Sequence, residues 1–175
     1  FGIDGEVAYY DGAGADLKYL DKLKTGRLSS VQTQAELALI QNSSGQAFAF
    51  ELGTGRLSEP LPLMERSLKQ SFILSNQQAL LVTYQGPLMT DLNKAKSSFK
   101  SPMAVEDSKK QICFCADPPG CKLRLVGFTD GTLCVGHRKG GRPLFTFYQE
   151  SGAVGAAAVN LQTALGARVG TEGEI

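Results

Sequence analysis

The sequence predicts an all-β chain made of repeated units of about 40 to 45 residues. In each unit a β-rich stretch ends in a polar turn that carries a glycine, and an alternating strand pattern follows: Gly5, Gly45, Gly86, Gly131 and Gly173. The intervals between these glycines are 40, 41, 45 and 42 residues. Glycine suits a tight hairpin turn because it adopts positive φ without steric cost. Repeated strands and turns with this period are typical of β-propeller blades, and we expect roughly four of them.

Two of the units match in more detail. Gly45 and Gly131 are each followed ten residues later by a second glycine, Gly55 and Gly141. Both second glycines stand beside residues that favour a reversal of the chain, so they predict a second hairpin turn. Each of these units is therefore expected to hold at least three consecutive antiparallel strands. The small residues of 151–168 suit an inner strand, where blades converge.

The units resemble the degenerate blades of Trp-Asp-repeat and quinoprotein-type propellers over nearly the whole chain. The phrase at 125–132, Leu-Val-Gly-Phe-Thr-Asp-Gly-Thr, is similar to degenerate blades of vesicle-tethering and coat subunits. The chain has no Trp, so the Trp-Asp ending and the tryptophan docking motif are both missing, and the resemblance is to the superfold. The chain starts at Phe1 and stops within a strand pattern. We therefore expect residues 1–175 to be a single propeller domain or a fragment of a larger propeller.

Two segments between the predicted strands are candidate contact surfaces. Residues 91–120 hold five lysines and four acidic residues among serines and prolines, which predicts an inserted surface loop. Residues 136–142, Gly-His-Arg-Lys-Gly-Gly-Arg, read as a cationic turn between strands. We expect protein partners to contact the molecule through these two loops, of which the first suits an acidic partner.

Composition excludes several classes of function. The formal net charge is +1 and the pI is about 7.8, so there is no overall field to attract nucleic acid. No apolar run reaches the roughly 18 to 20 residues of a membrane span. Four cysteines are too few for a disulfide-rich secreted scaffold. These features predict an intracellular, cytoplasmic protein.

The cysteines are the most specific chemical feature of the sequence. Cys113 and Cys115 lie on one face if their segment is a strand, and the following Asp-Pro-Pro-Gly turn would bring Cys121 back towards them. With Cys134 they would complete a tetrahedral zinc set, in which His137 is a substitute ligand. A disulfide between Cys115 and Cys121 and a set of plain thiols are the alternatives, and all three stay open. Cys134 also aligns with an apolar strand position of an earlier unit, which favours a place in the core.

The sequence shows no arrangement of residues that predicts catalysis. Its single His has no recognisable serine or cysteine partner motif, and no phosphate-binding loop is present. We therefore expect a non-catalytic protein–protein interaction scaffold, a subunit of a larger assembly, with zinc as the one cofactor to consider. Two alternatives remain, a zinc-stabilised binding module and an extracytoplasmic ligand-binding propeller marked by a disulfide.

Overall fold

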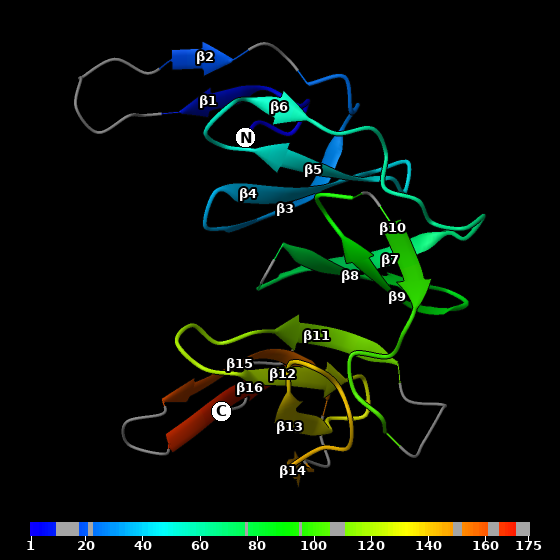
Figure 1. Cartoon of the computed structure of the whole chain (residues 1–175), viewed down its shortest axis with the longest axis vertical. Coiled ribbons are helices and arrows are strands. Elements are labelled where there is room, and N and C mark those ends of the chain that lie inside the picture. The colour runs from blue at the N-terminus through cyan, green and yellow to red at the C-terminus, as the bar shows by residue number, and fades with distance from the viewer. Residues whose placement is uncertain are drawn as a thin grey trace.

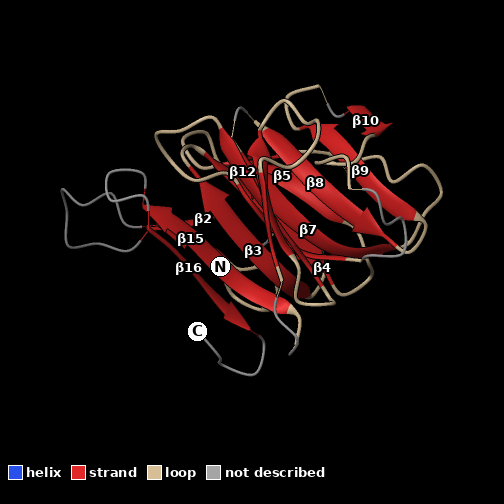
Figure 2. Cartoon of the chain, turned by 90° about the horizontal axis from the view of Figure 1, so that it is seen from below, coloured by secondary structure: helices blue, strands red, loops and turns tan. Residues whose placement is uncertain are grey.

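The computed structural model confirms an all-β chain (Figure 1). The structure describes residues 1–9, 18–20, 23–75, 77–94, 96–105, 111–148, 152–160 and 165–170. Within these ranges the chain forms strands and turns, and no helix is present (Figure 2). Every pairing between neighbouring strands is antiparallel, as expected for strands joined by tight turns.

Twelve of the described strands form three four-stranded sheets, and each sheet is ordered as in the chain. Sheet 1 consists of β3 (Leu28–Gln34), β4 (Leu37–Asn42), β5 (Ala47–Glu51) and β6 (Arg56–Leu57). Sheet 2 consists of β7 (Leu68–Leu74), β8 (Gln78–Thr83), β9 (Gly86–Asp91) and β10 (Lys96–Phe99). Sheet 3 consists of β11 (Ile112–Ala116), β12 (Leu123–Phe128), β13 (Leu133–His137) and β14 (Phe145–Phe147).

Two hairpins flank the three sheets. One pairs β1 (Val7–Tyr9) with β2 (Lys18–Leu20), and the other pairs β15 (Val154–Asn160) with β16 (Leu165–Gly170). By their place in the repeat, β1 and β2 correspond to the last two strands of a sheet, and β15 and β16 correspond to the first two. Three whole units and two halves make the four periods that the glycine spacing predicts.

Four of the five repeat glycines, Gly5, Gly45, Gly86 and Gly131, have the positive φ that a tight turn requires, and Gly173 lies outside the described residues. Gly45 joins β4 to β5 with φ of 76°, and Gly131 joins β12 to β13 with φ of 81°. In the second predicted turns of these units, φ is 70° at Gly55 and 106° at Gly141. These angles lie in the left-handed region that strongly favours glycine, which explains why the repeat is visible in the sequence.

The first strand of each complete sheet, and of the hairpin β15–β16, has a register shift at its second residue. The shifted positions are Ser29, Lys69, Cys113 and Gly155. A β-bulge places one extra residue in a strand and turns the side chains around it. The bulge is therefore a regular element of the repeat, and it changes the direction of Cys113.

The three sheets follow one another along the molecule (Figure 1), and hydrophobic clusters lie between them. Between sheets 1 and 2, Leu39 and Ala49 pack with Leu81 and Leu88. A second cluster joins sheets 2 and 3 and contains Phe72, Leu74, Leu80, Val82, Val126, Phe128 and Cys134. Each sheet is thus covered by apolar side chains on the faces that meet its neighbours.

The expectation of one inserted loop over residues 91–120 is wrong for much of this segment. It contains β10, which pairs with β9 from Lys96 opposite Asp91 to Phe99 opposite Leu88, and it contains all of β11. The polar composition misled because β10 is an outer strand, and an outer strand needs no alternation of apolar residues. Residues 106–110 lie outside the described residues.

Candidate functional site

The two predicted contact segments come together on one side of sheets 2 and 3. The backbone N–H of Ala104 donates a hydrogen bond of 2.8 Å to the carbonyl oxygen of Gly141. Met103, which is 1% exposed, inserts into the core between the two sheets. A Cβ atom added at Gly136 would lie 2.8 Å from Met103 Cε, so the glycine makes room for this side chain. We call the surface made by the described residues of 91–105 and 136–142 the contact face.

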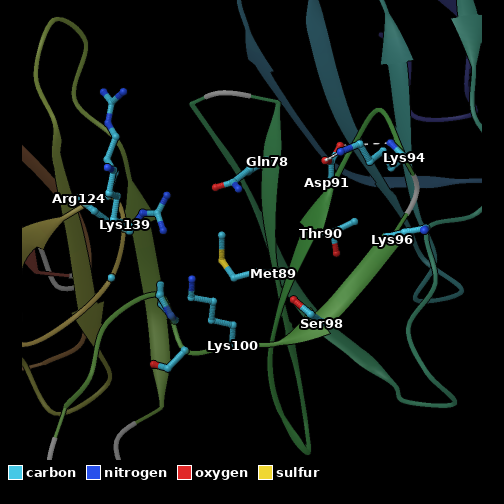
Figure 3. A pocket seen from close by; sticks show the side chains of 14 residues that line it. Gln78, Met89, Thr90, Asp91, Lys94, Lys96, Ser98, Lys100, Arg124 and Lys139 are labelled. Carbon is cyan, nitrogen blue, oxygen red and sulfur yellow. Dashed lines mark hydrogen bonds and ion pairs between the residues drawn. The ribbon is translucent and has the colours of Figure 1, made fainter.

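A pocket of about 710 Å³ opens on the contact face, between sheets 2 and 3. Figure 3 shows Lys96 and Ser98 on one side, Arg124 and Lys139 on the other, and Lys100 between them. Met89 and Thr90 line it as well. Its charged lining residues are six cations and one carboxylate: Lys94, Lys96, Lys100, Arg124, Arg138, Lys139 and Asp91.

Two of these cations are held by a buried carboxylate within the protein. Arg124 donates from Nε to Asp117 Oδ1 at 2.7 Å and from Nη2 to Asp117 Oδ2 at 3.0 Å. The Arg124 side chain is 2% exposed and the Asp117 side chain 0%. Arg138 Nε lies 3.7 Å from Asp117 Oδ2. The charge of Asp117 is thus shared between two guanidinium groups.

Asp117 also joins sheet 3 to sheet 2. Its Oδ2 atom accepts hydrogen bonds from the backbone N–H of Ser75 at 3.2 Å and from Ser75 Oγ at 2.6 Å. Ser75 stands in the turn after β7, whereas Asp117 follows β11. Burial by itself would lower the pKa of the Arg124 guanidinium, but the hydrogen bonds and the charge of Asp117 outweigh it and raise that pKa. Arg124 therefore stays charged and holds Asp117 within sheet 3, while the two hydrogen bonds from Ser75 connect this carboxylate to sheet 2. We call these three residues the latch.

The lysines of the pocket have a different environment. Lys94 Nζ lies 3.7 Å from Asp91 Oδ2 in an exposed pair. Lys96, Lys100 and Lys139 are exposed, and none of them forms an ion pair with another residue that the structure describes. Their ammonium groups are available to an anion from outside the chain.

The structure does not bring the four predicted zinc ligands together. The bulge at Cys113 turns this residue towards the hairpin β15–β16, where its Sγ donates to the carbonyl oxygen of Val154 at 3.3 Å. Cys115 and Cys134 belong to the core between sheets 2 and 3. Cys121 Sγ donates to the carbonyl oxygen of Pro118 at 3.5 Å. The expectation that residues 113 and 115 share a face is therefore wrong, because a bulge breaks the alternation of the strand.

All four cysteines are free thiols, so the disulfide between 115 and 121 is not formed. In the part of the chain that is described, no group of three or more His, Cys, Asp or Glu side chains lies close enough to hold a metal ion. Burial raises the pKa of the Cys115 thiol to about 12. Burial also raises the pKa of Cys113. His137 is exposed at the end of β13.

Sequence reasoning missed the latch residues. Asp117 is one of the four acidic residues that the sequence places in a surface loop, and Arg124 is not among the predicted site residues. The available signal was the position of Arg124 between Leu123 and Leu125 in an apolar stretch, since a charged residue among buried strand residues requires a partner. The partner itself, seven residues earlier across a turn, is visible only in three dimensions.

Comparison with solved structures decides the fold. The β-propeller domain of Cps50 (Swd1) from Myceliophteria thermophila superposes with a TM-score of 0.69 and 13% identity, over 96% of this chain and 56% of that one. A chain of the mitotic checkpoint complex gives a TM-score of 0.69 and 13% identity, over 95% of this chain and 51% of that one. The chain has the β-propeller fold.

The computationally designed Ika8 protein is also similar, with a TM-score of 0.63 and 15% identity over 90% of this chain and 48% of that one. The chain thus spans about half the length of these three propeller structures. A comparison with protein-family models gives no match, and neither does a sequence comparison with curated proteins. Within the described residues, no helix has the length and apolar character needed to cross a membrane.

Proposed function

We propose that this propeller is a non-catalytic protein–protein interaction scaffold, a subunit of a larger assembly, and that a protein partner binds its contact face. One observation carries the proposal: two segments far apart in sequence are joined into a single exposed surface. The Ala104–Gly141 hydrogen bond and the buried Met103 hold that surface on the sheets. A surface fixed in this way presents its side chains without the entropic cost of ordering a free loop.

The fold and the thiols support this function. Similar propeller structures include a chain of the mitotic checkpoint complex, which is a multi-protein assembly by its name. Four free thiols fit a reducing compartment, so we place the chain in the cytoplasm.

Site-specific photo-crosslinking tests the proposal. A benzophenone amino acid is introduced at Lys96 or Arg142 in the contact face, and at Lys24 or Arg56 as exposed controls outside it. We expect the same protein adduct from both contact-face positions and not from the controls after irradiation in the native cells. Equal adducts at all four positions, or none at the contact face, would refute the proposed binding surface.

A further inference from the structure

We infer that the pocket of the contact face binds an acidic, carboxylate-rich peptide segment of the partner. This inference rests on the proposed function, because it names the chemistry that the contact face recognises. Six cations and one carboxylate line the pocket, although the chain as a whole is nearly neutral. The positive charge is therefore concentrated at this place, and a concave surface of one sign attracts the opposite charge.

The cations of the pocket divide into two groups according to their partners. Arg124 is engaged by Asp117 through two hydrogen bonds. Arg138 donates from Nε to the carbonyl oxygen of Leu123 at 3.2 Å and from Nη2 to that of Pro118 at 2.6 Å. Both guanidinium groups are used within the protein, so an external ligand meets mainly the ammonium groups of the lysines.

The lack of a free arginine fork favours carboxylates over phosphate as the ligand chemistry. Sites that read phosphorylated residues typically use the planar fork of arginine, which bonds two phosphate oxygens at once. The two arginines that line the pocket are bonded within the protein and do not offer that fork. Lys96 and Lys139 stand on opposite sides of the pocket, and Lys100 lies between them, with its Cε within 3.9 Å of a Cβ built at Gly140. Point charges spread over two walls match several separate carboxylates along a peptide.

The rest of the lining suits an extended chain that carries such groups. Half-buried Met89 supplies apolar surface for the aliphatic part of a glutamate side chain, while the exposed Ser98 and Ser101 line the pocket with hydroxyl groups. Because the lysines are exposed, binding depends strongly on ionic strength. The partner segment is therefore expected to be rich in Glu or Asp and to bind reversibly.

Fluorescence anisotropy with the full chain tests the inference. The probe is a labelled peptide of about ten residues in which Glu alternates with small residues, and the control probe has Gln at every Glu position. A phosphoserine peptide of equal net charge and inorganic phosphate are the competing ligands. Titrations are made at about 0.05 M and about 0.3 M NaCl, since salt screens exposed charges.

We expect the Glu peptide to bind at low salt, to bind at least about tenfold more weakly at high salt, and to lose about tenfold in affinity in the double variant Lys100→Gln with Lys139→Gln. The charge-matched control, Lys24→Gln with Arg56→Gln, should bind as the unmodified chain does. Urea midpoints check that all variants fold. Equal binding of the Gln peptide, no binding of the Glu peptide, or tighter binding of the phosphoserine peptide or of phosphate would overturn the inference.

A failure of the acidic-ligand inference can be distinguished from a failure of the proposed scaffold function. Specific crosslinks at the contact face together with no Glu-peptide binding would refute the acidic ligand and leave the scaffold function standing. Glu-peptide binding that disappears in the lysine variant, together with no crosslinked protein, would support the pocket chemistry and refute the protein partner.

Discussion

Replacing Asp117 by Asn is the sharpest test of what holds sheets 2 and 3 together. The two side chains are almost equal in size, so the change removes the negative charge and leaves the packing in place. Arg124, whose side chain is 2% exposed, then carries a buried positive charge without its counter-ion. The bonds from Ser75 Oγ and Ser75 N–H lose the charged acceptor at the same time.

The expected loss is about 3–5 kcal/mol of unfolding free energy, the range for removing one partner of a buried ion pair. A domain of ordinary stability has about 5–15 kcal/mol in total, so the variant would lose a large part of it. The exposed pair of Asp91 and Lys94 provides the matched control, with side chains 38% and 72% exposed. Asp91→Asn should cost no more than about 1 kcal/mol, because water screens an exposed pair.

Urea unfolding at neutral pH measures both values. With a urea slope of about 2 kcal/mol per molar, Asp117→Asn should lower the midpoint by roughly 1.5–2.5 M, and Asp91→Asn by at most about 0.5 M. Equal shifts for the two variants would mean that the contacts of Asp117 stabilise the protein no more than an exposed ion pair does. Amide hydrogen exchange would then show whether the turns after β7 and β11 still open together.

Three further changes test other parts of the structure. Met103→Ala should cost about 2–5 kcal/mol in urea unfolding, because it empties a fully buried position between sheets 2 and 3; a cost below about 1 kcal/mol would show that the segment is not anchored. Gly131→Val should cost more than about 1 kcal/mol because φ is 81° there, and a neutral result would contradict the repeat alignment. At about pH 9, an alkylating reagent should modify Cys121 before Cys115, because Cys115 is buried and its pKa of about 12 keeps the thiol protonated. Peptide mass spectrometry measures the two rates, and equal rates would contradict the placement of Cys115 in the core. The folded Cys115 thiol keeps a proton that the unfolded chain loses at about pH 8.5–9, so this group makes stability fall as pH rises from there towards about 12.

The repeat was predictable because its turns depend on glycine. A left-handed turn residue such as Gly45 or Gly131 leaves a mark in the sequence that recurs with the period of the fold. Strand β10 has no such signal in the sequence. Its side chains at Lys96 and Ser98 are exposed, and a strand at the outer edge of a sheet can be polar throughout. Composition therefore predicted a loop where the structure has a paired strand.

The contact face was predicted in its parts and not as a whole. Residues 91–120 and 136–142 were each expected to meet a partner, but the spacing of residues contains no information on the hydrogen bond between Ala104 and Gly141. The bulge at Cys113 was hidden for a related reason. A register shift depends on how two strands pair, and the sequence of one strand does not determine it.

The charged residues around the pocket have two different roles, and the sequence alone does not distinguish them. Asp117 neutralises Arg124 inside the protein, and the hydrogen bonds from Ser75 to Asp117 connect the sheet 2 and sheet 3 walls of the pocket. Lys100 and Lys139 have no such counter-charge among the described residues and face the solvent. Asp117→Asn should therefore lower stability far more than the lysine variant does, whereas the lysine variant should weaken the Glu peptide without moving the urea midpoint. If both variants changed stability and binding together, the buried and exposed charges would form one network and this separation would be wrong.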